Sequence, residues 1–145
     1  MAKASKRTAA EIRAVIDDWA EGMRRKDAAR VMAHGAQGFL HFSLAPPLIA
    51  EDAGAEGLKA WFDTWRGPIE FEMADLEITA GEDVAFCTSI NRLAGTKTDG
   101  ETNEIWFRQT LGLKNENGAW KIAHLHESVP FYMDGSLRAA VDLKP

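Results

Sequence analysis

Two histidines near the end of the chain are the residues best suited to do chemistry. His124 and His126 are separated by a single residue within Trp120–Val129, a run whose composition predicts a strand. Alternate residues of a strand point to the same face, so both imidazoles are expected on one face of a sheet. An imidazole titrates near neutral pH and can act as a general acid or base. The alternative is that both histidines are structural and hydrogen-bonded beneath covering helices.

The preceding strand supplies a polar partner for these histidines. Asn117-Gly118 separates Trp120–Val129 from the strand-like run Glu104–Lys114, and Asn-Gly between two such runs is a strong hairpin signal. A two-residue turn there places Gln109 opposite His126, on a face that is otherwise apolar. We therefore expect Gln109 to point toward the same interior.

An arginine of an earlier strand completes this set. If Asp99-Gly100 is also a two-residue turn, Arg92 points inward. An unpaired buried charge is costly, so its partner would be a ligand carboxylate or phosphate, or else Glu70 or Glu72. An apolar wall with a few convergent polar groups is typical of a small-molecule pocket. The polar side chains expected in this pocket are His126 as acid or base, with His124, Arg92 and Gln109 binding the substrate.

Tryptophans are abundant for a chain of 145 residues, with five in all. Trp19, Trp61 and Trp65 are expected on core-facing surfaces, either as plain core or as an aromatic lining for a hydrophobic ligand. Trp106 falls on the outer face of the sheet, where it would suit a dimer interface.

The elements that must position these side chains follow from hydrophobic periodicity. Thr8 and Glu11 fit a capping box that opens a helix over about residues 9–25. Helices are followed by period-2 runs, which is an α+β layout in which the helices cover one face of a curved sheet. The further elements expected are short helices over about 28–32, 55–65 and 136–143, and strands over about 39–44, 69–80, 84–94, 102–114 and 120–129.

Composition restricts the classes of function. The length predicts a single domain over residues 1–145, with residues 1–7 as a disordered terminus. The net charge of −5, without a basic stripe, argues against nucleic-acid binding. No apolar run reaches the roughly 20 residues of a membrane helix, and no signal peptide is evident, so a cytoplasmic protein is expected. The lone Cys87 is expected to be a buried thiol. No metal site is expected, because the two histidines have no evident third ligand on their face.

The segment from Gly118 to Pro130, Gly-Ala-Trp-Lys-Ile-Ala-His-Leu-His-Glu-Ser-Val-Pro, resembles the last strand of SnoaL-like proteins of the ketosteroid isomerase type. These proteins belong to the nuclear transport factor two-like superfamily. Arg108–Lys114 is similar to the adjoining strand, and the resemblance extends over about residues 8–133. It implies a cone-shaped α+β barrel, in which a strongly curved, mainly antiparallel sheet wraps around N-terminal helices. It also implies a cavity in the cone and a homodimer formed through the outer face of the sheet.

The chain departs from the isomerase pattern of a catalytic aspartate with a tyrosine and a protonated aspartic acid. Its only tyrosine, Tyr132, follows the last strand, and the expected inner face of the last two strands has no aspartate. By analogy with polyketide cyclases, His126 takes the acid/base role. The hypothesis is a cofactor-free isomerase, cyclase, dehydratase or hydrolase acting on a hydrophobic or aromatic small molecule. The alternative is a non-catalytic ligand-binding or dimerisation module of the same fold.

Overall fold

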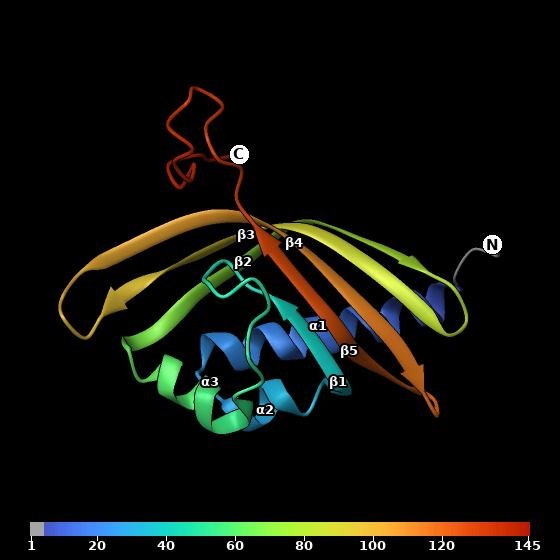
Figure 1. Ribbon diagram of the computed structural model, residues 1–145. Helices are drawn as coiled ribbons and strands as arrows, with labels where there is room; N and C mark the ends of the chain where they lie inside the picture. The colour runs from blue at the N-terminus through green and yellow to red at the C-terminus, as the bar shows by residue number, and fades with distance from the viewer. Residues whose placement is uncertain (1–4) are drawn as a thin grey trace.

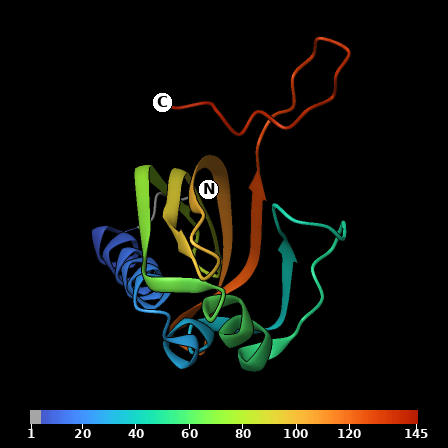
Figure 2. The ribbon, with the colours of Figure 1, turned by 90° about the vertical axis from the view of Figure 1, so that its left-hand side faces the viewer.

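The computed structural model describes residues 5–145, whose helices lie together on the concave side of one long curved sheet (Figure 1). The strands form an arch over the helices in Figure 1, and both views show the chain after the last strand extending beyond the sheet (Figures 1 and 2). This confirms the α+β cone. The elements are α1 (Lys6–Arg24), α2 (Ala28–Met32), β1 (Gly35–Phe42), α3 (Gly54–Phe62), β2 (Trp65–Ala80), β3 (Val84–Lys97), β4 (Thr102–Glu116) and β5 (Ala119–Ser128).

The five strands are ordered β1-β5-β4-β3-β2. Strands β2 to β5 pair antiparallel, each with the next in the chain, whereas β1 pairs parallel with β5. The parallel pairing brings the first strand beside the last, so residues far apart in the sequence share one edge of the cone.

Helix α1 begins earlier than its sequence pattern predicts. Ser5 is the N-cap, and its hydroxyl accepts a hydrogen bond from the amide of Thr8 at 3.0 Å. The predicted cap at Thr8 is therefore wrong, and residues 5–7 are not a disordered terminus; residues 1–4 lie outside the described chain. The helix buries one stripe against the sheet, where Trp19 meets Phe71 edge-on at 5.7 Å between ring centroids. Burial of each large apolar side chain of this kind contributes about 1.5–3 kcal/mol.

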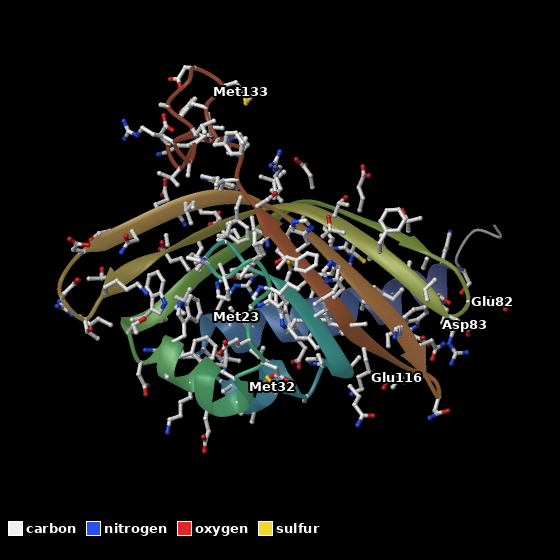
Figure 3. All side chains as sticks on the ribbon, in the orientation of Figure 1. Met23, Met32, Glu82, Asp83, Glu116 and Met133 are labelled. Atoms are coloured by element: carbon white, nitrogen blue, oxygen red, sulfur yellow. The ribbon has the colours of Figure 1, made fainter. Side chains whose placement is uncertain are left out.

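The helix predicted over residues 136–143 does not form. The chain after β5 instead folds back through a bridge between Phe131 and Ala139, with Asp134 and Ser136 bonded in the turn. This tail stands off the sheet, and Met133 is 87% exposed (Figure 3).

Strand register decides which side chains face the helices. The predicted turn at Asn117-Gly118 is confirmed, since Glu116 pairs with Ala119. However, β5 carries a bulge at Ala123, so that Gly112 pairs with His124. The extra residue turns every later side chain of β5 to the face opposite to the one predicted.

The β3–β4 connection also differs from the prediction. Thr96 pairs with Thr102, so residues 98–100 form a three-residue loop in place of a two-residue turn. The pairing shifts by one, and Arg92 lies opposite Trp106 on the outer face. The side chains of β3 that point inward are Ala85, Cys87, Ser89 and Asn91, all of them buried.

Candidate functional site

A row of polar side chains crosses the concave face of the sheet. Ser89 of β3 lies opposite Gln109 of β4, which lies opposite Glu127 of β5. His41 of β1 closes the row, since its Nε2 lies 2.6 Å from Oε1 of Glu127. Asn91 sits two residues along β3 from Ser89, on the same face. Polar groups gathered on an otherwise apolar interior need a structural or functional explanation.

Two of these side chains are buried with an unpaired polar atom. The Ser89 hydroxyl donates to Oδ1 of Asn91 at 2.7 Å, and among residues 5–145 the Nδ2 of Asn91 has no partner. Gln109 Nε2 has only Sδ of Met73, a weak acceptor, at 3.9 Å, and its Oε1 has no partner in the described chain. Asn91 is 0% exposed and Gln109 2%. Each unpaired buried group costs about 1–3 kcal/mol of stability, so these two atoms do not stabilise the fold.

The His41–Glu127 pair lies at the accessible end of the row. The side chains of His41 and Glu127 are 29% and 16% exposed, so the pair is partly desolvated but reachable. No lysine or arginine of residues 5–145 forms an ion pair with Glu127. The backbone of His41 is held by the following loop, because the amide of Ala50 donates to its carbonyl at 2.9 Å. A carboxylate and an imidazole in direct contact can accept, share and return a proton.

A second histidine–carboxylate pair links α1 to the segment around α2. His34 Nε2 lies 2.6 Å from Oδ2 of Asp18. Arg30 also donates twice to Oδ1 of Asp18, at 2.9 and 2.6 Å. The hydrogen bond from Arg30, followed by the one from His34, lowers the pKa of Asp18 to about 2. This cluster joins α1 to the end of α2, and its carboxylate is held in the charged form.

The predicted inward placement of His124 and His126 is wrong, because the bulge at Ala123 turns them to the outer face. Nδ1 of His124 donates to the carbonyl of Leu40 at 2.7 Å. The ring of Phe42 meets both imidazoles edge-on, at 4.9 and 5.2 Å between centroids. His126 still borders a hollow of about 630 Å³, beside Glu127. The remaining walls of this hollow are Phe42, Ser43, Leu44, Ala45, Pro46, Pro47, Leu48 and Ile49.

The predicted inward placement of Arg92 is also wrong. Its guanidinium lies on the outer face, where it donates to Glu104 at 2.8 and 3.0 Å and to Glu70 at 3.2 Å. The hydrogen bond to Glu104 raises the pKa of Arg92 above its ordinary value. The sequence left open whether Arg92 pairs with a ligand anion or with Glu70 or Glu72. In the structure it pairs with glutamates, and its Nη1 also lies 3.8 Å from Oε1 of Glu72.

Gln109 points inward, as the turn at Asn117-Gly118 predicts. Trp19 and Trp65 are buried in the core, and Trp61 is half-buried with its ring 5.8 Å from that of Trp65. The ammonium of Lys97 lies 3.8 Å from the centroid of the Trp65 ring, a cation–π contact. Trp19 and Trp65 are therefore part of the hydrophobic core, and Trp61 packs against it.

The sequence analysis did not identify His41, Ser89, Asn91 or Glu127 as residues of the site. The inward positions of β3 are small or polar, so the hydrophobic pattern of this strand does not point to them. Burial raises the pKa of the Cys87 thiol to about 11, which confirms a buried thiol rather than a nucleophile.

Within the described residues, no three His, Cys, Asp or Glu side chains lie together so as to hold a metal ion. None of the helices in that part of the chain is long and apolar enough to cross a membrane.

Comparison with solved structures supports the same fold. An NTF2-like protein of unknown function from Pseudomonas putida KT2440 is 30% identical, with a TM-score of 0.83 over 99% of this chain and 100% of its own. A ketosteroid isomerase-like protein from Erwinia carotovora atroseptica is 20% identical, with a TM-score of 0.71 over 86% of this chain and 97% of its own. The association domain of Caenorhabditis elegans CaMKII is 18% identical, with a TM-score of 0.66 over 85% and 96%.

No functionally curated protein matches the chain. The family model described as a SnoaL-like domain matches residues 12–132, most of the sequence. The chain therefore belongs to the SnoaL-like domain family.

Proposed function

We propose that the chain is a cofactor-free enzyme that transfers a proton on a hydrophobic or aromatic small molecule bound against the concave face of the sheet. The observation that carries this proposal is the His41–Glu127 contact of 2.6 Å at the accessible end of the polar row. Apolar walls with a few convergent polar groups are typical of small-molecule sites.

The roles follow from the chemistry of each side chain. Glu127 takes a proton from a ligand carbon next to a carbonyl, and the electron pair of the broken C–H bond moves toward the carbonyl oxygen. His41 orients Glu127 and shares the proton until it returns to the same or another ligand atom. Asn91 donates to the oxygen on which negative charge develops, a contribution of the oxyanion-hole kind. Proton transfer of this kind underlies isomerisation, cyclisation and dehydration.

His126 is a second candidate for the acid or base. It borders the hollow beside Glu127, and its imidazole is exposed. A ligand in that hollow would meet His126 rather than His41, so the two candidates predict different effects of substitution.

The experiment is solvent deuterium exchange at the α-carbon of 2-tetralone, followed by proton NMR in D₂O. We expect Glu127→Gln to slow protein-catalysed exchange at least about 100-fold, the lower end of what general acid–base catalysis contributes. His126→Gln should leave the exchange rate within about twofold of that of the unchanged protein. Asp18→Asn is the matched control, because it also removes a carboxylate that contacts a histidine, and it should leave the exchange rate unchanged. If Glu127→Gln exchanges as fast as the unchanged protein, the proposal is wrong; if His126→Gln alone is slow, the base is His126.

A second candidate function is a non-catalytic homodimerisation or ligand-binding module, and the outer face of the sheet favours it. Val84 and Phe86 point outward from β3 and are 59% and 49% exposed. Exposed apolar side chains gathered on one face are typical of interaction surfaces. Sedimentation velocity of Phe86→Glu against Thr88→Glu, its outward neighbour, tests this. We expect the unchanged protein and Thr88→Glu to sediment as dimers and Phe86→Glu as a monomer; a monomeric unchanged protein would contradict the homodimer.

A further inference from the structure

We infer that the buried amides of Asn91 and Gln109 select an uncharged ligand with a hydroxyl or enol group at its polar end. This inference rests on the proposed function insofar as the ligand is placed against the concave face. It goes further in naming the group that is recognised and the side chain that moves to admit it.

The two amides offer complementary atoms. With respect to residues 5–145, Nδ2 of Asn91 is a free donor and Oε1 of Gln109 a free acceptor, and both are buried. Gln109 lies opposite Ser89, two residues from Asn91, so the two amides are diagonal neighbours on adjacent strands. Such neighbours are about 7–8 Å apart, close enough for both side chains to reach one ligand oxygen. A hydroxyl oxygen accepts from Asn91 and its proton is donated to Gln109, which satisfies both atoms.

Charge at the row excludes an anionic ligand. In residues 5–145, no lysine or arginine side chain hydrogen-bonds to Asn91, Gln109 or Glu127. Arg92, the cation that would have received a carboxylate, is occupied on the outer face by Glu104 and Glu70. A ligand carboxylate would lie near the carboxylate of Glu127 with no lysine or arginine bonded to either group within residues 5–145, which is unfavourable in a desolvated site.

Met73 lies beside both amides. It lies on β2 directly opposite Asn91, and its Sδ contacts Nε2 of Gln109 at 3.9 Å. The two unpaired amide atoms have almost no accessible surface, so a ligand can reach them only if a neighbouring side chain moves. Methionine is flexible and adopts alternative conformations at little cost. The inference assigns this movement to Met73, the flexible side chain that contacts Gln109 and lies beside Asn91.

The test is isothermal titration calorimetry of the full chain at pH 7 with three probes: 2-naphthol, 2-methoxynaphthalene and 2-naphthoate. The methyl ether cannot donate to Gln109, so we expect 2-naphthol to bind at least tenfold more tightly than the ether, and 2-naphthoate to bind most weakly. Gln109→Met, which keeps the side-chain length, should bring naphthol and ether to within about twofold. Met73→Ala should tighten the binding of both. Thr88→Val, which removes a hydroxyl from the outer face, is the matched control and should change nothing.

Stability provides a readout that a merely structural amide would not give. Within residues 5–145 the side chain of Gln109 makes only one weak hydrogen bond, so Gln109→Met should keep or raise the melting temperature, and the variant will be folded for the titration. A lower melting temperature with an unchanged preference for naphthol would overturn the inference. Equal binding of naphthol and ether, or binding of none of the probes, would overturn it as well. Preference for naphthol without Glu127-dependent exchange would contradict only the proposed enzyme, and exchange without preference only this inference.

Discussion

The molecule contains two histidine–carboxylate pairs of equal length in different surroundings. His34–Asp18 and His41–Glu127 both have a nitrogen–oxygen distance of 2.6 Å. Asp18 is also bound twice by Arg30, and its side chain is 41% exposed. Glu127 has no such cation in the described chain, and its side chain is only 16% exposed.

The difference shows that contact distance does not identify a functional pair. A guanidinium holds the carboxylate of Asp18 in its charged form, which suits it to join two helices and makes it a poor base. Glu127 has an imidazole as its partner and lies next to buried amides with unpaired atoms. The surroundings of the carboxylate therefore distinguish structure from chemistry.

The largest expected effect on stability tests the strand that presents Glu127. Leu125 lies between the two outward histidines and is 6% exposed, so Leu125→Ala should cost about 2–5 kcal/mol of unfolding free energy. His126→Ala, on the opposite face, should change it by about 0.5 kcal/mol or less. Urea denaturation of both variants measures this. If His126→Ala is the more damaging, the histidines face the core and Glu127 faces solvent.

This register is also where sequence reasoning reached its limit. The hairpin at Asn117-Gly118 could be predicted because Asn-Gly specifies its turn locally. The bulge at Ala123 has no comparable local signal, and one extra residue reverses the faces of everything after it.

The inward face of β3 was predicted wrongly for a second reason. Its outward positions include the apolar Val84, Phe86 and Ile90, whereas Ser89 and Asn91 point inward, so the hydrophobic pattern favours the wrong face. The fold follows from periodicity over whole elements, but the site depends on a bulge, a loop length and polar residues that contradict the pattern.

Substitution of His41 and of His34 by glutamine should affect different properties of the protein. His41→Gln should slow tetralone exchange by about 10-fold or more, because Glu127 loses the group that orients it and shares its proton. His34→Gln should leave exchange unchanged and lower stability by about 1 kcal/mol, the worth of one hydrogen bond. Exchange rates and urea denaturation of both variants check this, and a loss of exchange in His34→Gln would remove the distinction between the pairs.

The smallest expected effect concerns pH and the Asp18 cluster. The pKa of Asp18 is lowered in the folded state from 3.8 to about 2, so its contribution to stability is complete above pH 3.8 and is lost as the pH falls through about 2. Asp18→Asn should therefore be less stable than the unchanged protein at pH 7, and the difference should shrink between pH 4 and pH 2. Thermal unfolding across this range measures it, with Asp17→Asn, an exposed neighbour on the same helix, as the control. A difference that does not depend on pH would show that Asp18 does not act through its charge.

The measurement that tests the central claim most directly is the NMR spectrum of the side-chain amides of Asn91 and Gln109 during titration with 2-naphthol. The two pairs of NH₂ resonances can be assigned with Asn91→Leu and Gln109→Met. If the concave polar row is the binding site, these resonances shift and saturate together with binding, while the amide of Asn103, an exposed asparagine on β4, stays in place. Shifts confined to residues around His126 and the 43–49 loop, with both buried amides unchanged, would contradict the account and move the site to the outer hollow.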